Sequence, residues 1–222
     1  MSKKPYVVVI GRQFGSGGHE IGVRLAEKLG IPLYDKEILA KIAQEKDIDP
    51  ERLNKMDESL RGGQLLNVGI QAAGFRLNNP GYFFETDTSA VVCRNQAFEW
   101  QAETIRKLAE EGSCVMIGRC ADYVLRNHPG LISVFISAPL ADRESRIARL
   151  HPDHPRKYHE THLEFIQKTD KARASYYNYH TDRNWASIGN YHLCLDSSKL
   201  GIEGSVNLLA DYVKHAMECV SE

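Results

Sequence analysis

The chain has 222 residues, of which 42% are hydrophobic and 26% are charged, and its formal net charge is −1. These values are typical of an ordinary globular protein, and the length favours one domain, residues 1–222, over two. The near-neutral charge gives no overall basic field that would indicate a nucleic-acid polymer or an anionic membrane as the partner.

The distribution of apolar residues and of cysteines indicates what kind of globular protein this is. No segment approaches the roughly 20 consecutive apolar residues that a membrane span needs. Five cysteines are scattered along the chain without a Cys-x-x-Cys pair, and reduced cysteines in such positions behave as small hydrophobic residues. We therefore expect a cytoplasmic protein that buries its core without disulfides.

The first predicted elements are a strand, a glycine-rich turn and a helix. Residues 6–10 form a β-branched run, which predicts a strand buried on both faces. The turn Gly15-Ser-Gly-Gly18 follows, and apolar residues then keep helical spacing from Ile21 to Leu29, up to the stop at Gly30. A strand, a glycine loop and a helix in this order are typical of a phosphate-binding site.

The remaining pattern alternates between strands and helices. Strands are predicted at residues 31–35, 114–117, 132–136 and 191–195, with helices near 38–42, 90–111, 140–150, 161–177 and 202–220. Such alternation predicts an α/β fold with three α/β/α layers around a five-stranded parallel sheet. Two segments fall outside the simple alternation: we expect a helical insertion at residues 46–90 and a lid at residues 150–175.

The glycine turn meets the physical requirements of a phosphate loop. Successive backbone N–H groups and a helix N-terminus together form a concave positive site for phosphate. Glycines keep side chains out of the way of the oxyanions and allow positive φ. We expect the nucleotide to be bound by six consecutive residues, Gly15, Ser16, Gly17, Gly18, His19 and Glu20.

The same turn departs from the Walker A pattern G-x-x-x-x-G-K-[ST]. With Gly17 at the last glycine, Gly18 occupies the lysine position and His19 the hydroxyl position. Gly18 cannot place a positive charge on the β- and γ-phosphates. Two residues are hypothesised to supply it instead, Arg12 from the other side of the loop or a protonated His19.

Four stretches of the sequence resemble the cytidylate kinase-like family, the relatives of bacterial cytidylate kinase. They comprise Ile10–Asp35, Ile117–Leu125 with its Gly118-Arg119 pair, Val134–Arg146, and Asp170–Glu203 with its Asp-x-x-Arg pair. Together they cover nearly the whole chain. The resemblance implies a P-loop kinase fold and phosphoryl transfer from ATP, with Mg²⁺, to the nucleoside monophosphate CMP or dCMP.

The resemblance also implies roles for individual residues. Lys41 and Arg119 would hold the acceptor monophosphate, and Asp170 with Arg173 would bind its sugar and base. A second set would face the transferring phosphates from the lid side, consisting of Arg143, Arg146 and Arg149. Asp35 follows a strand, and ligands bind at the carboxyl ends of parallel strands. The family's aspartate before the Gly-Arg pair is Ile117 here, so Asp35 or Asp122 would contact magnesium, through water.

Each of these patterns also has a structural alternative. The glycine turn can connect a strand to a helix without a ligand, and the three arginines of residues 143–149 can form a solvated helix face. Lysines on helices, such as Lys41, are usually at the surface. The histidines of residues 151–162 can hold zinc or lie in a lid loop. Tyr176, Tyr177, Tyr179 and Trp185 can stack on a base, pack the lid helix or form a homodimer contact.

Three other functions compete with CMP phosphorylation. A non-catalytic nucleotide sensor would bind ATP on the loop without transferring phosphate, and a related kinase would use a different small acceptor. A purely structural role is the third. A phosphate oxygen is already an anionic nucleophile, so phosphorylation of a monophosphate requires no general base, and the sequence is not expected to contain a catalytic dyad.

Overall fold

The computed structural model describes residues 5–35, 37–45 and 88–219, and its centre is one parallel sheet. All neighbouring strands pair in parallel, in the order β2-β3-β1-β4-β5. The strands are β1 (Val7–Arg12), β2 (Leu33–Tyr34), β3 (Cys114–Ile117), β4 (Leu131–Ser137) and β5 (Leu193–Asp196). The order places the first strand between the third and the fourth, so the loop after β1 leaves from the middle of the sheet.

Alternating side chains of β1 build the two halves of the core. Val7 and Val9 point to one face, where they pack with Ile105 and Met116. Val8 and Ile10 point to the other face, into a second cluster that contains Ile21, Ile136 and Leu209. A strand that is apolar on both sides is the expected consequence of a parallel sheet covered on both faces.

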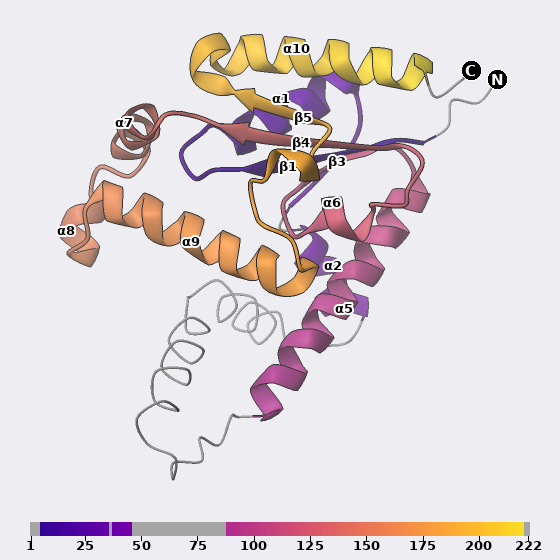
Figure 1. Cartoon of the computed structure of the whole chain (residues 1–222), viewed down its shortest axis with the longest axis horizontal. Helices are drawn as coiled ribbons and strands as arrows, with labels where there is room; N and C mark the ends of the chain where they lie inside the picture. Colours follow the sequence, from indigo (N-terminus) through magenta and orange to yellow (C-terminus); the bar gives the residue numbers. More distant parts are fainter. Residues whose placement is uncertain (1–4, 36, 46–87, 220–222) are drawn as a thin grey trace.

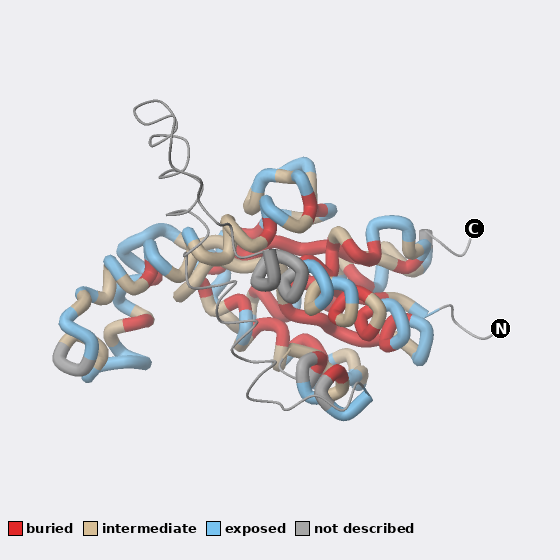
Figure 2. The backbone as a smooth tube through the Cα atoms, turned by 90° about the horizontal axis from the view of Figure 1, so that it is seen from below, coloured by how far each residue is buried: buried red, intermediate tan, exposed pale blue. Residues whose placement is uncertain are grey.

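Among the described residues, helices cover both faces of the sheet (Figure 1). On one side lie α1 (Gly18–Leu29) and α10 (Ser197–Cys219), which pack against each other. On the other lie α2 (Glu37–Glu45), α5 (Thr88–Glu111) and the short α6 (Ala121–Val124). Figure 2 shows the buried residues concentrated in the sheet and on the helix faces toward it. The predicted three-layer α/β/α fold is confirmed.

A group of helices extends from the carboxyl end of the sheet. Helix α7 (Leu140–Leu150) follows β4, the short α8 (His154–Tyr158) comes next, and α9 (His162–Thr181) runs back beneath the sheet (Figure 1). A capping box starts α9: the Thr161 hydroxyl accepts the Glu164 N–H, and the Glu164 carboxylate accepts the Thr161 N–H. This cap fixes the start of the helix that carries Asp170 and Arg173.

The predicted elements and the observed ones differ mainly at their ends. The strand at residues 114–117 and the helix at residues 140–150 have the predicted bounds. The last strand starts at Leu193 and not at residue 191, because a 3₁₀ turn, η1 (Ile188–Asn190), precedes it. The sequence analysis offered a lid loop or a zinc site for residues 151–162, whereas residues 154–158 form α8, with Pro155 in a first helical turn, where proline is accepted. The predicted insertion at residues 46–90 lies outside the described residues except for its last three.

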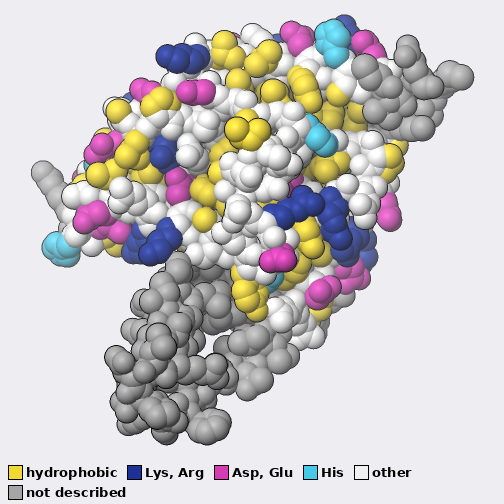
Figure 3. All heavy atoms as spheres, viewed as in Figure 1, with side chains coloured by type: hydrophobic (Ala, Val, Ile, Leu, Met, Phe, Trp, Pro, Cys, Tyr) yellow, Lys and Arg dark blue, Asp and Glu magenta, His cyan; other side chains and the backbone are white. Residues whose placement is uncertain are grey.

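The surface carries both signs of charge. Figure 3 shows acidic and basic side chains interspersed on the face seen in Figure 1, as the formal net charge of −1 suggests. Within the described part of the chain, no helix has both the length and the apolar character needed to cross a membrane.

Helices α5 and α9 are joined by a half-buried histidine, His180. The imidazole of His180 stacks on Phe98 with ring centroids 4.2 Å apart and lies 4.6 Å from the Tyr176 ring. Desolvation lowers the pKa of His180 from 6.5 to about 4. The folded protein therefore holds this ring neutral, while the unfolded chain takes up a proton below pH 6.5.

We expect acid sensitivity from this histidine. As the pH falls from about 6.5 toward about 4, protonation of the unfolded chain should lower the free energy of unfolding, by an amount on the order of 2 kcal/mol. The variant His180→Phe keeps the stacking but cannot titrate, so urea unfolding across this pH range should show a shallower decline. The same substitution at exposed His215, on α10, should leave the decline unchanged. Equal slopes for wild type and His180→Phe would contradict the assignment.

Candidate active site

The loop after β1 has the backbone geometry of an anion-binding turn. Gly15 and Gly17 have φ of 82° and 80°, in the left-handed region that favours glycine, and α1 begins at Gly18. Ser16 is buried, and its carbonyl accepts a hydrogen bond from the Ser197 hydroxyl at 2.6 Å. The loop is thereby fixed to the start of α10. It presents a helix N-terminus at the carboxyl edge of the sheet, where ligands bind in open α/β folds.

Helix α7 packs directly on the two loop glycines. A β-carbon on Gly15 would lie 2.9 Å from the carbonyl oxygen of Arg143, and one on Gly17 would lie 2.9 Å from Nη2 of Arg146. Both contacts are too close for a larger residue. The glycines therefore permit the positive φ values and also let a helix carrying two arginines approach the loop.

The Arg12 side chain runs across two further glycines. A β-carbon on Gly18 would lie 2.6 Å from Cβ of Arg12, so the arginine stem fills the space beside the lysine position of the Walker pattern. A β-carbon on Gly118 would collide with the Arg12 guanidinium. Arg12 thus extends from the end of β1, past the start of α1, to the loop that follows β3.

The next two residues of α1 interact with acidic and basic partners around the loop. Nε2 of His19 lies 3.6 Å from Oδ2 of Asp35, at the end of β2. Glu20 pairs with Arg146 at 3.1 Å and with Arg24 at 2.7 Å. The Glu20 carboxylate therefore holds Arg146 beside the first turn of α1.

Asp170 connects helix α9 to the loop after β1 and to α7. Its Oδ1 accepts the Phe14 N–H at 2.7 Å, and its Oδ2 forms an ion pair with Nη1 of Arg143 at 2.6 Å. Nη1 of Arg143 also donates to the Phe14 carbonyl at 3.2 Å. Arg143 is only 8% exposed. The solvated-face alternative thus fails for this arginine and for Arg146, whereas Arg149 is exposed.

Arg173 approaches the loop from the next turn of α9. Its Nη1 donates to the Arg12 carbonyl at 3.0 Å, and its guanidinium lies over the Phe14 ring at 5.4 Å. Sequence reasoning assigned Asp170 and Arg173 to the sugar and base of the acceptor. In the structure their described contacts are with the phosphate loop and α7.

The loop after β3 has an unusual backbone and carries Arg119. Three consecutive residues have positive φ: Gly118 at 70°, Arg119 at 58° and Cys120 at 55°. Residues other than glycine rarely adopt this conformation, and where they do, surrounding contacts must compensate the strain. Arg119 is buried, and its guanidinium donates from Nε to the Asp35 carbonyl at 2.9 Å and from Nη1 to Oε1 of Gln101 at 3.2 Å.

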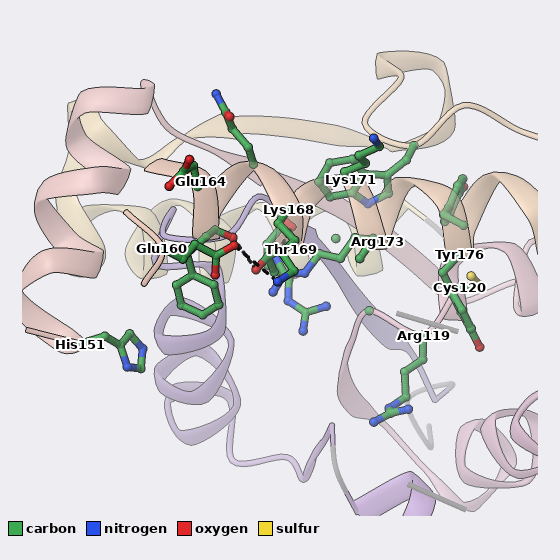
Figure 4. Close-up of a pocket in the computed structure, with 18 of the residues that line it drawn as sticks. Arg119, Cys120, His151, Glu160, Glu164, Lys168, Thr169, Lys171, Arg173 and Tyr176 are labelled. Atoms are coloured by element: carbon green, nitrogen blue, oxygen red, sulfur yellow. Dashed lines mark hydrogen bonds and ion pairs between the residues drawn. The ribbon is translucent and has the colours of Figure 1, made fainter. Parts of the chain in front are cut away.

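A large cavity of about 1220 Å³ lies between this loop and α9. Figure 4 shows it bounded by α9, which carries Lys168, Lys171 and Arg173, and by the loop that carries Arg119. Arg12 and four aromatic residues also line it, namely Tyr176, Tyr177, Trp185 and Tyr191. The cavity therefore combines several cations with flat apolar rings. A second cavity of about 190 Å³ lies on the α7 side of the loop, against Gly15, Ser16, Arg146 and Ile202.

The sequence profile of the cytidylate kinase-like family matches residues 7–199. The chain belongs to the cytidylate kinase-like family. Its phosphate loop, the Gly118-Arg119 pair and helix α9 all lie within the matched region. No curated protein sequence matches the chain.

Solved structures support the same fold. An uncharacterized protein from Eubacterium ventriosum is 25% identical, with a TM-score of 0.65 over 94% of this chain and 98% of its own. A shikimate kinase from Bacteroides thetaiotaomicron is 13% identical, with a TM-score of 0.53 and coverage of 95% and 99%. A gluconokinase from Sinorhizobium meliloti is 16% identical, with a TM-score of 0.51 and coverage of 96% and 95%. The two kinases establish the fold alone; together with the family, the fold supports a phosphotransferase.

The two aspartates considered for magnesium lie in different surroundings. Asp122 is 7% exposed and accepts the Tyr177 hydroxyl at 2.7 Å, and desolvation raises the pKa of its carboxyl. A raised pKa disfavours the anion that a hard cation needs. Asp35 lies beside His19 at the start of α1. Mg²⁺ in kinases is bound by one or two carboxylates together with waters and substrate phosphates, and Asp35 fits this role better.

The other candidate residues have contacts that favour structural roles. Nζ of Lys41 pairs with Glu111 at 3.4 Å. The same ammonium lies 5.7 Å from the centroid of the Tyr34 ring, at the end of β2. The role of Lys41 in acceptor binding stays a prediction. In the lid, Nε2 of His154 lies 3.2 Å from Glu160. The described residues contain no group of three or more histidine, cysteine or acidic side chains that could hold a metal ion, and the zinc alternative gains no support from them.

Two functional candidates escaped the sequence analysis. Gln101 contacts Arg119 from α5, and Ser197 fixes the phosphate loop from α10. Neither belongs to a motif, and a glutamine or serine within a helical pattern gives no signal by itself. The burial of Gln101 on an amphipathic helix is predictable from the sequence, but its contact with Arg119, 18 residues further along the chain, is not.

The Asp170 contacts should contribute measurably to stability. The variant Asp170→Asn removes the charge that pairs with Arg143, and we expect the free energy of unfolding to fall by about 1.5–3 kcal/mol. Urea unfolding at neutral pH measures this change. The control Asp153→Asn alters an exposed residue before α8 and should shift stability by less than about 0.5 kcal/mol. If the two variants are equally stable, the Asp170 contacts are not structural.

Proposed function

We propose that this chain is a nucleoside monophosphate kinase that transfers the γ-phosphate of ATP to CMP or dCMP, with Arg12 in the role of the missing Walker lysine. Phosphoryl transfer requires mainly positioning and positive charge around the phosphates. The single observation that carries the proposal is the path of the Arg12 side chain, from the loop's lysine position to the Gly118-Arg119 turn.

This path explains why the lysine position holds glycine. A side chain at residue 18 would compete with the Arg12 stem, since its Cβ would lie 2.6 Å from Cβ of Arg12 and 3.2 Å from Cβ of Ile136. In this proposal the cation comes from Arg12, at the end of β1, and not from the first residue of α1, where the Walker A pattern has lysine and this chain has Gly18. Arginine remains charged and can contact two phosphate oxygens at once, which suits it to this role.

The two cavities support separate places for the two substrates. ATP would be bound by Gly15–Glu20, with its nucleoside toward the smaller cavity beside Arg146. The acceptor would occupy the larger cavity, with its phosphate near Arg12 and Arg119 and its base near the aromatic rings. Arg12 lines the acceptor cavity and borders the loop, so it can contact phosphates from both sides.

The charged side chains around the two cavities suit phosphoryl transfer between two negatively charged phosphates. Arg12, Arg119 and Arg146 would stabilise negative charge on the donor and acceptor phosphates. Asp35 would hold magnesium through water, and the bound ion would supply further positive charge to the donor phosphates. The acceptor oxygen is already anionic, and no side chain is needed as a base.

A nucleotide sensor is the second candidate, and one observation favours it. The Asp170 carboxylate already accepts the Phe14 N–H and pairs with Arg143. A lid helix bound to the loop in this way can report nucleotide binding without chemistry. This candidate predicts ATP binding with no γ-phosphate transfer.

A coupled ADP-release assay tests the function directly. It uses ATP, Mg²⁺ and a panel of acceptors comprising CMP, dCMP, UMP, AMP and shikimate. Turnover with CMP or dCMP above the rate without acceptor supports the proposal. Turnover with another acceptor only would reject the specificity while retaining a kinase. No turnover with any acceptor, combined with an ATP-dependent rise in thermal stability, would favour the sensor.

Arg12 provides the sharpest mutational test. We expect Arg12→Ala to lower kcat by about 10²–10³-fold, because it removes one preorganised cation from the transferring phosphate. Thermal unfolding should show that the variant remains folded, and Arg12→Lys should retain more activity than Arg12→Ala. The matched control Lys107→Ala removes an exposed cation of α5 that pairs with Glu45 and Glu103 and should leave kcat within about twofold. Unchanged kcat in Arg12→Ala would exclude Arg12 from the lysine role.

A further inference from the structure

We infer that Gln101, a buried residue of α5 outside every recognised motif, is a positioning residue that fixes the Arg119 guanidinium for the acceptor phosphate. The inference rests on the proposed function, because it assigns Arg119 to the acceptor. Gln101 is 2% exposed, and its side-chain amide contacts both the backbone carbonyl and the guanidinium of Arg119.

The Gln101 amide makes three hydrogen bonds. Its Nε2 donates to the Arg119 carbonyl and to the Tyr176 hydroxyl, each at 3.0 Å. Its Oε1 accepts from Nη1 of Arg119 at 3.2 Å. A primary amide has two N–H donors and one carbonyl oxygen. Both donors and the oxygen of this buried amide are therefore used, two of them on the same residue.

These contacts compensate a strained backbone. Arg119 has φ of 58°, a conformation that few residues other than glycine adopt. In this conformation the carbonyl and the guanidinium of Arg119 both reach Gln101. One amide can hold them together, so it stabilises the backbone turn and the direction of the side chain at the same time. A hydrophobic residue of similar size would leave a buried carbonyl without this donor.

The contacts also define the plane of the guanidinium. Nη1 is held by Gln101 and Nε by the Asp35 carbonyl, at 3.2 and 2.9 Å. Because a guanidinium is rigid and planar, two contacts on different nitrogens fix its orientation. A cation whose orientation is fixed before the ligand arrives loses less entropy on binding than a freely rotating one. Gln101 would thereby strengthen acceptor binding without touching the acceptor.

Tyr176 extends the network to the lid helix. Its hydroxyl accepts from Gln101, and its ring lines the large cavity. Helix α9, which carries Tyr176, also binds the phosphate loop through Asp170 and Arg173. The position of α9 is therefore connected, through one amide, to the arginine on the opposite side of the acceptor cavity.

A kinetic double-mutant cycle tests this role. We expect Gln101→Leu to raise the KM for CMP about tenfold or more, while the KM for ATP changes by less than about twofold. In the Arg119→Ala background, the same substitution should cause no further change, since the two residues act as one unit. Tyr176→Phe should give a smaller rise in the KM for CMP. Additive effects of Gln101→Leu and Arg119→Ala, or equal rises in both KM values, would overturn the inference.

A control separates positioning from general destabilisation. Ile105 lies on α5, one turn beyond Gln101, and is fully buried. Ile105→Val should lower the melting temperature without changing the KM for CMP. If Ile105→Val reproduces the kinetic effect of Gln101→Leu, the effect belongs to the stability of α5 and the inference fails.

A second measurement does not depend on activity. Hydrogen exchange of the Arg119 Nε–H can be followed by NMR and assigned by the loss of the signal in Arg119→Lys. We expect at least about tenfold faster exchange in Gln101→Leu and no change in Ile105→Val. Wild-type protein without turnover on any monophosphate would reject the proposed function, and the exchange rates would still decide whether Gln101 holds Arg119. Equal exchange in wild type and Gln101→Leu would overturn the inference.

Discussion

Arg12 leaves the end of the central strand, and its side chain occupies space that a β-carbon on Gly18 or Gly118 would need. This steric constraint links three parts of the site: the phosphate loop, the start of α1 and the turn after β3. It requires glycine at two positions far apart in the sequence. At Gly18, the lysine position of the Walker pattern, the atoms in the way of a side chain are Cβ and Cγ of Arg12 and Cβ of Ile136.

Around this constraint, charged groups bind helix α9 to the loop. Asp170 accepts the Phe14 N–H and pairs with the buried Arg143, while Arg173 donates to the Arg12 carbonyl. On the other side, Gln101 and the Asp35 carbonyl hold Arg119. Two arginines, Arg12 and Arg119, thus line the large cavity from neighbouring strand ends.

The fold and part of the site were predictable because they depend on local patterns. Strand-like and helix-like periodicity indicated the layers, and the glycine turn indicated the loop at Gly15–Gly18. Arg12 was a candidate because it lies within the loop motif. Lys41 was placed at the acceptor by its register in the family, whereas its contact with Glu111 depends on how α2 packs against α5. The insertion at residues 46–90 falls largely outside the described residues.

The sequence by itself determined the α/β class, the position of the phosphate loop and the absence of a lysine from it, since these follow from residue order and short-range periodicity. Only the tertiary structure decided the strand order, the route of Arg12 between two glycines, the partners of Asp170 and the contact of Gln101 with Arg119. The physical reason is that most of the contacts behind these features join residues distant in the sequence, from 18 positions for Gln101 and Arg119 to 156 for Phe14 and Asp170. Side chains so distant in sequence come into contact only when the sheet brings its strand ends to one edge, and local sequence patterns do not predict such contacts.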